Sequence, residues 1–185
     1  MQTEMTNSNS RPWHLRLTAG LLLLLWLIVR AFRSSSPGEA WILAASFTIL
    51  AHLLIGVWVF LHKLRATSAW HRSADAFAFL FLSGAVASTA NTPLWCAFFS
   101  GLFAVAILKY HLCAEAGLSD DLTAYTREKI RLEAPAVVVF VLAALVTARL
   151  PETHPLRLRV EALLFFSAIL FAFYLIALRR IYVFK

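Results

Sequence analysis

The stretch AWILAASFTILAHLLIGVWVFL, residues 40–61, decides the fold class of this chain. It holds no Asp, Glu, Lys or Arg, and a helix needs about 20 mostly apolar residues to cross the hydrocarbon of a bilayer. Trp41 and Trp58 lie near its two ends, where amphipathic rings prefer the level of the lipid headgroups. The stretch therefore predicts a membrane-spanning helix.

The composition extends this prediction to the whole chain. Of its 185 residues, 61% are apolar and only 15% are charged, whereas soluble domains average about 45–50% apolar and about 25% charged residues. A chain this short cannot hide the excess in a core, because much of its surface would still face water. A soluble globular protein, a disulfide scaffold and a disordered chain are excluded, which leaves a multi-spanning membrane protein.

Five more apolar stretches flank the first one. The long run from Ala74 to Leu112 is interrupted by Asn91-Thr92-Pro93. Proline lacks a backbone donor and is accepted in the first turn of a helix, so this tripeptide predicts a tight turn with Pro93 opening the next helix. We expect an all-α, polytopic transmembrane bundle of about six spans in a single domain over residues 1–185. The predicted spans are 15–32, 40–61, 74–90, 93–112, 134–150 and 160–178.

The one long polar stretch between spans, residues 115–133, has a helical charge pattern. Ser119 can cap a helix whose first turn holds Asp120 and Asp121, and basic residues follow near its far end. This polarity suits the helix dipole. We expect a cytoplasmic amphipathic helix that lies at the membrane interface and leads into the fifth span.

The net charge of +7 arises from 17 basic and 10 acidic residues. The basic residues form short clusters between apolar runs, and no basic stripe with interleaved aromatic residues suggests nucleic-acid binding. If successive spans alternate in direction, twelve of the 17 basic residues fall on the side of the membrane that also holds both termini. Because loops rich in Lys and Arg stay in the cytoplasm, this bias predicts that both termini are inside. The segment Arg149 to Arg159 is the exception, because its three arginines fall outside. We expect the bacterial cytoplasmic (inner) membrane as the location.

The first span has a second interpretation. Arg11, His14 and Arg16 precede an apolar run that ends at Val29, as in the n- and h-regions of a signal peptide. Pro37 directly after the candidate cleavage motif, and Arg30 and Arg33 before it, favour an uncleaved first helix. A cleaved signal remains the alternative.

His52 is the one ionisable residue near the middle of a predicted span, and it is a candidate intramembrane functional residue. Ala45, Thr48 and Gly56 share its helical face. A stripe of small and polar residues is expected to face other helices and not lipid. Ionisable residues inside a membrane are costly to bury and commonly functional, so His52 is either a satisfied packing residue or a proton relay or ligand.

Three other histidines, His62, His71 and His111, are candidate metal or haem ligands. The predicted topology places all three near the cytoplasmic ends of their spans, and facing helices are where bundles build such sites. Their spacing gives no pair one turn apart, so the ligands would have to converge from separate helices. No cofactor is assigned, and haem or metal remains an option.

Ser83, Ser88 and Asn91 form a candidate polar path on one half of the third span. The same region carries small residues four positions apart, including Gly84 with Ser88 and Ala97 with Gly101. Such residues allow two helix backbones to approach closely. We expect this stretch chiefly to pack the 74–90 and 93–112 helices against each other.

The predicted function follows mainly from what the spans lack. No Asp or Glu falls in the central part of a predicted span, whereas ion-coupled transporters and pumps usually need one. Catalytic motifs are also missing, and enzymatic activity is not expected. We expect an accessory or assembly subunit, or an oligomeric component, whose partners are the lipid bilayer, other membrane subunits or further copies. The alternatives are a channel or transporter for a small neutral or weakly charged solute and a membrane haem- or metal-binding redox protein.

Overall fold

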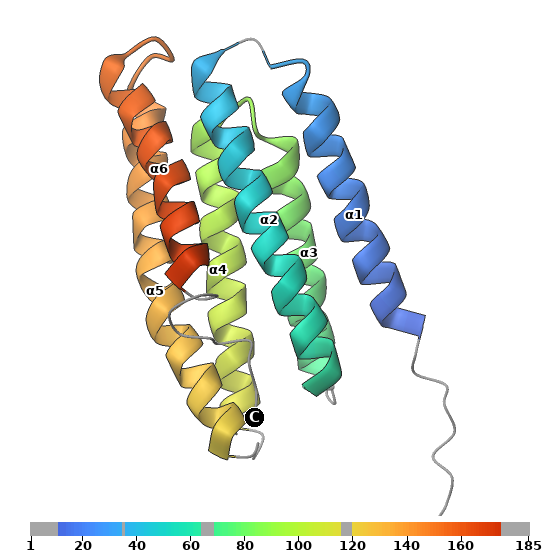
Figure 1. Cartoon of the computed structure of the whole chain (residues 1–185). Coiled ribbons are helices and arrows are strands. Elements are labelled where there is room, and N and C mark those ends of the chain that lie inside the picture. The colour runs from blue at the N-terminus through green and yellow to red at the C-terminus, as the bar shows by residue number, and fades with distance from the viewer. Residues whose placement is uncertain (1–10, 35, 64–68, 116–119, 175–185) are drawn as a thin grey trace, which may run out of the picture.

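A computed structural model describes residues 11–34, 36–63, 69–115 and 120–174, with side chains over 18–34, 36–54, 73–112 and 123–174. All regular structure in these residues is helical, and they contain no strand. The predicted all-α class is therefore confirmed. The six helices (Figure 1) are α1 Arg11–Ala31, α2 Pro37–Lys63, α3 Ala69–Ala87, α4 Thr92–Glu115, α5 Asp120–Arg149 and α6 Pro155–Phe173.

Each predicted span falls largely on one of these helices, and the predicted turn at Asn91 is confirmed. The backbone turns after α3, and α4 begins at Thr92 with Pro93 in its first turn. The Oδ1 atom of Asn91 accepts a hydrogen bond from the backbone N–H of Leu94 at 3.1 Å. This bond satisfies one of the backbone donors that a helix N-terminus leaves without an intrahelical partner.

The stretch before the fifth span differs from its prediction. The expected interfacial helix over 115–133 is not separate, because Asp120–Arg149 form one helix that continues through Pro135. Thr126, Lys129 and Glu133 are buried, with at most 3% of their surface exposed. The charge pattern does form a helix, but Lys129 and Glu133 face the bundle and pair with each other on α5 at 2.6 Å. The Thr126 hydroxyl donates to the Thr123 carbonyl of the same helix at 2.9 Å.

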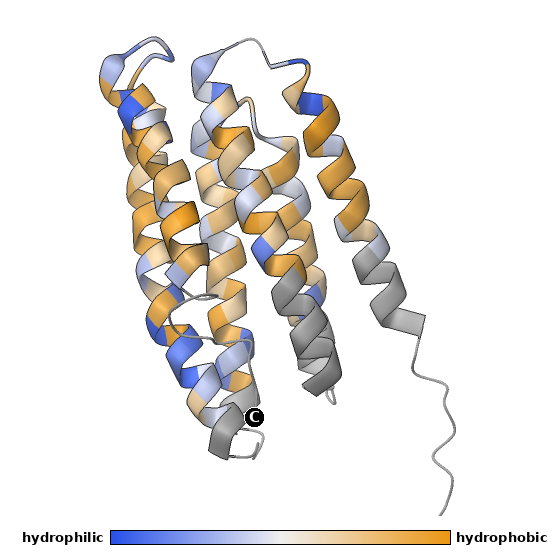
Figure 2. Ribbon diagram, in the orientation of Figure 1, coloured by the Kyte–Doolittle hydropathy of each residue, from blue (hydrophilic) through white to orange (hydrophobic). Residues whose placement is uncertain are grey.

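Three stretches of the described helices are long and apolar enough to cross a membrane, namely Pro37–Leu54, Thr92–Leu112 and Thr123–Arg149. Two shorter apolar stretches are Thr18–Ala31 and Ser73–Ala87. Apolar residues cover the middle of the bundle, whereas hydrophilic residues gather toward its ends and along the lower part of α5 (Figure 2). This is the architecture of an integral membrane protein built from transmembrane helices.

The six helices form two layers of three. Close backbone contact joins α1 to α2 and α2 to α6 in one layer, and α3 to α4 and α4 to α5 in the other. Between the layers the backbones stay further apart, and α5–α6 and α1–α3 touch only marginally. Figure 1 shows α2 and α6 in front of α4 and α5. Large side chains must therefore fill the space between the layers, which we call the interlayer interface.

The α3–α4 pair packs through reciprocal insertion of rings. A Cβ atom on Gly84 of α3 would lie 2.5 Å from the Phe98 ring of α4, and one on Gly101 of α4 would lie 2.4 Å from the Phe81 ring of α3. The Phe81 and Phe98 rings meet edge to face, with centroids 6.4 Å apart. Glycine is needed at both positions because the rings occupy the space of a side chain. The predicted packing of this hairpin through its small residues is confirmed.

Candidate functional site

The middle of the interlayer interface is an aromatic block, which consists of Trp95, Phe99, Phe103 and Phe140. The Trp95 and Phe99 centroids are 4.7 Å apart, and the Phe140 ring stacks on Phe99 at 5.6 Å and on Phe103 at 5.7 Å. Apolar residues of α2 and α6 complete this core. The indole N–H of Trp95 donates to the Ser46 hydroxyl of α2 at 2.7 Å, so the block is fixed to the opposite layer by a polar contact.

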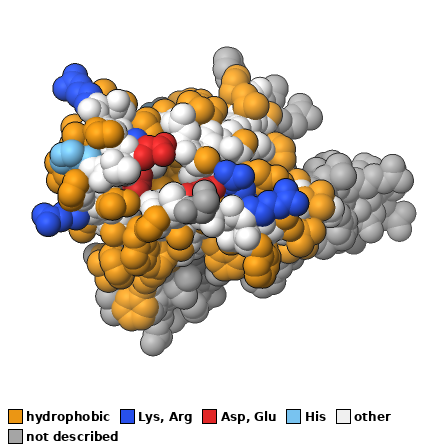
Figure 3. Space-filling model, turned by 90° about the horizontal axis from the view of Figure 1, so that it is seen from above, with side chains coloured by type: hydrophobic (Ala, Val, Ile, Leu, Met, Phe, Trp, Pro, Cys, Tyr) orange, Lys and Arg blue, Asp and Glu red, His pale blue; other side chains and the backbone are white. Residues whose placement is uncertain are grey.

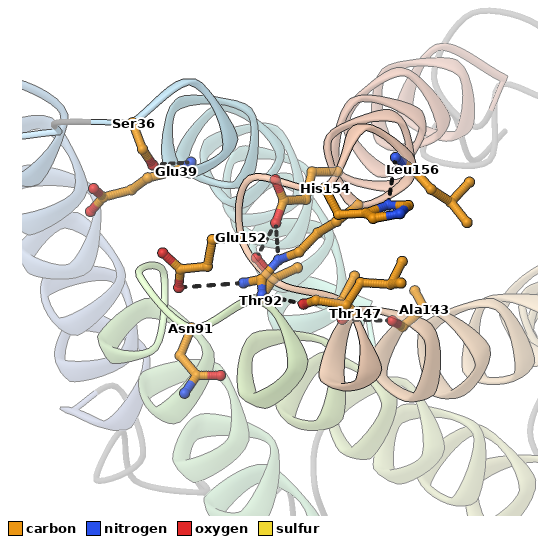
Figure 4. A network of polar contacts seen from close by, with 12 residues as sticks. Ser36, Glu39, Asn91, Thr92, Ala143, Thr147, Glu152, His154 and Leu156 are labelled. Carbon is orange, nitrogen blue, oxygen red and sulfur yellow. Dashed lines mark hydrogen bonds and ion pairs between the residues drawn. The ribbon is translucent and has the colours of Figure 1, made fainter.

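A buried ionic group, the Arg157 cluster, lies at the end of the bundle where α6 begins (Figure 4). The Arg157 Nε atom lies 3.1 Å from Glu161 Oε1, and the side chains are only 9% and 3% exposed. Glu161 Oε1 also accepts a hydrogen bond from the Thr92 hydroxyl of α4 at 2.6 Å. Arg157 further donates to the Leu150 carbonyl at 3.1 Å and pairs with the exposed Glu152 at 3.6 Å. The cluster thus joins α4, the end of α5 and α6.

Local sequence explains why these groups meet. Pro155 starts α6 and the His154 side chain caps it, which places Arg157 in the first turn and Glu161 one turn later. The N-termini of α2, α4 and α6 lie at the same end of the bundle (Figure 1), and each carries partial positive charge. A Cβ atom on Gly38 would lie 2.2 Å from Glu161 Oε2. The Glu161 carboxylate therefore lies against the first turn of α2 and balances charge from three helices.

A second ionic group, the Lys129 cluster, lies in the other half of the interlayer interface. Lys129 and Glu133 of α5 form an ion pair at 2.6 Å, with side chains 3% and 4% exposed. The Lys129 ammonium is 5.9 Å from the ring centroid of Tyr110 on α4, a distance at which a cation is attracted by the ring. His52 of α2 is likewise buried, with 6% of its surface exposed.

The two clusters lie at different depths in the bundle. Glu161 is six residues from the start of α6, about 9 Å along the axis, whereas His52 and Glu133 are 15 and 16 residues from the same end of α2 and α5, about 23 Å. By the same count, two rings of the aromatic block lie between them, namely Phe103, eleven residues from the start of α4, and Phe140, nine residues from the end of α5. The interlayer interface therefore consists of one polar zone near an end of the bundle, an aromatic zone and a second polar zone deep inside.

Further charged pairs lie near the two ends of the bundle. Arg30 of α1 pairs with Glu39 of α2 at 2.8 Å, and Lys109 of α4 pairs with Asp75 of α3. Figure 3 shows the end of the bundle at which α2, α4 and α6 begin. Acidic side chains lie toward the middle of this surface, and basic side chains lie around them. Part of the positive charge counted in the sequence is thus balanced within the fold.

The structure places the predicted histidines in different surroundings. His52 lies in the interlayer interface, with its ring 5.9 Å from Phe171 of α6, and Ala45 on the same face is fully buried. His111 is exposed near the end of α4. The side chains of His62 and His71 fall outside the described residues. Among the residues that are described, no group of three or more His, Cys, Asp or Glu side chains could hold a metal ion.

The structure places the three residues of the predicted polar path on α3 and in the turn that leads to α4. Ser83 is half-buried on α3. The Ser88 hydroxyl donates to the Gly84 carbonyl at 2.5 Å, and the Asn91 side chain caps α4. Ser88 and Asn91 thus use polar atoms to complete the α3–α4 turn, at the edge of one layer.

The sequence reasoning missed the strongest candidates, which are Arg157, Glu161, Lys129 and Glu133. Two of them were assigned to a surface helix, and the other two were placed at or before the start of the last span. One signal could have found them. Both pairs have opposite charges at positions i and i+4, so each pair shares one helix face beside an otherwise apolar sequence.

Chemically, the interlayer interface offers carboxylates, an ammonium, a guanidinium, an imidazole and hydroxyls in a buried setting. Comparison of the chain with protein-family models, with curated protein sequences and with solved structures finds no match. The candidate site therefore rests on its own geometry.

Proposed function

We propose that the chain spans the inner membrane six times with both termini inside. The turns after α1, α3 and α5 share one end of the bundle (Figure 1), as helices that cross a membrane in alternating directions require. Arg30 and Arg157 are two of the five basic residues assigned to the outside, and each pairs with a carboxylate. Alkaline phosphatase fused after Glu152 should be active and a fusion after Lys185 inactive; the reverse pattern would overturn this topology.

We further propose that the chain is a channel or transporter for a small neutral or weakly charged solute, which passes between its two helix layers. The observation that carries the proposal is the pair of buried ionic clusters in the interlayer interface. The sequence has no Asp or Glu in the central part of a predicted span, which disfavours an ion-coupled pump but not passage of a neutral solute. Glu133, with its side chain 4% exposed, adds a buried carboxylate well inside α5.

The arrangement suits a gated path. The Arg157 cluster provides polar groups near one end, and the Lys129 cluster provides them about 23 Å along the helices from that end. Between them the aromatic block closes the interface, and hydrophobic constrictions of this kind gate pores by excluding water. The two layers contact each other mainly through side chains. A small rocking movement of one layer against the other can therefore open the interface while every helix keeps its backbone hydrogen bonds.

The test is solute flux into proteoliposomes, measured by stopped-flow light scattering with urea and glycerol and by a pH-sensitive dye for protons. Phe140→Ala should raise flux of at least one probe, because it shortens a ring at the centre of the aromatic block. Glu133→Gln should lower flux, because it removes the buried negative charge. Glu128→Gln is the matched control on the same helix, since its side chain is 30% exposed, and it should leave flux unchanged.

Two outcomes would contradict the transport proposal. One is flux no greater than in protein-free vesicles for every probe, with the wild-type chain and with Phe140→Ala. The other is an equal effect of Glu133→Gln and Glu128→Gln, because the burial of Glu133 would then have no bearing on passage.

The accessory or assembly role is the second candidate, and the closed packing of the interface favours it. Trp95 and Phe99 are fully buried, and their rings leave the described centre of the bundle filled. Native mass spectrometry in mild detergent tests this role. A copurifying subunit or a defined oligomer supports it, and a strict monomer alone would count against it.

A further inference from the structure

The first turn of α6 is capped by a side chain that can change its charge. His154 is the N-cap residue, with extended backbone angles of φ −70° and ψ 130°. Its Nδ1 atom accepts a hydrogen bond from the Leu156 backbone N–H at 3.2 Å (Figure 4). The usual caps are Ser, Thr, Asp and Asn, whose side-chain oxygens accept throughout the neutral pH range. The cap of α6 differs from these because protonation can remove its acceptor.

The cap bond requires the neutral form of the imidazole. A backbone N–H can only donate, so Nδ1 of His154 must carry a lone pair, and the ring proton lies on Nε2. A protonated imidazole has a donor at both nitrogens and cannot accept. Histidines change charge between about pH 5 and about pH 8. The stabilisation of α6 by this cap is therefore present at the upper end of that range and is lost as the pH falls.

The backbone at the start of α6 also disfavours a positive charge on His154. A helix N-terminus carries partial positive charge, and the imidazole lies directly at it. Pro155 is the first residue of α6 and has no backbone N–H. Leu156 therefore provides the first backbone donor of the helix, and the cap bond is the one that satisfies it.

The charged groups around the start of α6 give a protonated His154 no partner. The carboxylates of the adjoining segments pair with arginines: Glu39 of α2 with Arg30, and Glu152 of the turn and Glu161 of α6 with Arg157. The other charged side chains here are the exposed Arg149 of α5 and Arg159 of α6, and α4 begins with uncharged Thr92. Within the described part of the chain, no ion pair joins His154 to a carboxylate.

The cap lies next to the contacts that fasten the two layers together at this end. Arg157 is in the first turn of α6, where its guanidinium donates to the Leu150 carbonyl and pairs with Glu161, both at 3.1 Å. Glu161 in turn accepts a hydrogen bond from Thr92 of the other layer at 2.6 Å. Opening of the first turn of α6 therefore displaces the arginine that holds α6 against α4 and the end of α5.

We propose that His154 makes the start of α6 a pH-sensitive switch. In its neutral form it caps α6 and keeps the interlayer interface closed at this end. In its protonated form it releases the Leu156 N–H, the first turn of α6 opens, and the Arg157 cluster loosens. The switch responds to the pH on the side of the membrane that holds the turn between α5 and α6. It needs no solute and no path between the layers, so it is independent of the proposed transport.

The experiment is hydrogen exchange of the full chain in mild detergent, resolved to single amides by mass spectrometry, at about pH 5 and about pH 8. His154→Asn keeps a good cap that does not titrate, and His154→Ala removes the cap at both pH values. Variants are compared at the same pH, so the intrinsic pH dependence of exchange cancels. At the higher pH, the Leu156 amide of the wild type should exchange as slowly as in His154→Asn. At the lower pH it should exchange about fivefold faster, the factor that a helix cap supplies.

A second amide and a second histidine complete the test. The Trp95 amide, bonded to the Asn91 carbonyl at 2.9 Å in the first turn of α4, should also exchange faster at the lower pH in the wild type and not in His154→Asn. His111→Asn is the control, because His111 is exposed near the other end of the bundle, and it should behave as the wild type. Equal exchange of Leu156 in the wild type and His154→Asn at the lower pH would overturn the switch.

Two other results would also contradict the proposal. A response of Leu156 without any response of Trp95 would show that the cap does not act on the contact between the layers. Loss of the pH response in His111→Asn would assign it to a different histidine. If His154→Ala fails to fold, the comparison of the wild type with His154→Asn decides by itself.

Discussion

The Arg157 cluster allows a sharp test of whether buried charge is compensated within this bundle. Glu161→Gln keeps the shape of the side chain and an acceptor for the Thr92 hydroxyl, but it removes the charge that faces Arg157 at 3.1 Å. Arg157 is 7% exposed, and its other carboxylate partner, Glu152, is 77% exposed at 3.6 Å. Breaking a buried ion pair by removing one partner costs about 3–5 kcal/mol, because the remaining charge is left uncompensated.

We therefore expect Glu161→Gln to lower the free energy of unfolding by about 3 kcal/mol, the lower end of that range, since Glu152 and the Leu150 carbonyl remain. The assay is reversible unfolding by SDS in mixed micelles, followed by tryptophan fluorescence. Glu152→Gln is the matched control, because it removes the same charge from the same arginine at an exposed position. It should change the free energy by less than about 0.5 kcal/mol.

The double variant Arg157→Met/Glu161→Leu completes the test. Apolar replacement of an entire buried pair is often neutral or stabilising, so this variant should be more stable than Glu161→Gln. The reasoning would be refuted if Glu161→Gln were as mild as Glu152→Gln. It would also be refuted if the double variant lost at least as much stability as the two single changes together, because the two charges would then not be coupled.

Three further predictions concern packing. Gly84→Ala should lower the free energy of unfolding by about 1–3 kcal/mol in the same SDS assay, because its Cβ atom would lie 2.5 Å from the Phe98 ring; unchanged stability would contradict the ring insertion. Trp95→Phe removes the indole N–H that bonds across the interlayer interface and should cost about 1 kcal/mol or more in thermal or SDS unfolding, and a stabilised variant would argue against that bond. Cys96 is fully buried, so in a Cys113→Ser background a maleimide should label the folded protein negligibly and the SDS-unfolded protein fully; rapid labelling in mild detergent would contradict the closed packing.

Several features of the fold could be predicted because they depend on local sequence. Residues 40–61 predict a spanning helix from their apolar length alone, and α2 covers them. Asn91-Thr92-Pro93 predicts a turn because the chemistry of proline and of the cap acts within a few residues. The small residues of the third and fourth helices predict close packing, and Gly84 and Gly101 provide it. The single domain, the six membrane crossings and the orientation remain predictions.

The candidate site was predicted far less well, and the reason is physical. Lys129 and Glu133 look like residues of a solvated surface helix, because a charged stretch carries no local sign of what covers it. In the sequence, Arg157 looks like a basic loop residue of the kind that sets the orientation of a membrane protein. Only its contact with Glu161 shows that its charge is neutralised. His52 was recognised because it is isolated within an apolar run, yet its neighbours on α5 and α6 could not be named.

The sequence by itself determined that this protein is helical and apolar enough for a membrane, because those properties follow from composition and from periodicity within each segment. Only the tertiary structure decided which polar side chains face each other. The layers α1–α2–α6 and α3–α4–α5 bring together residues 69 positions apart, such as Thr92 and Glu161, and the burial of a charge depends on the helices around it.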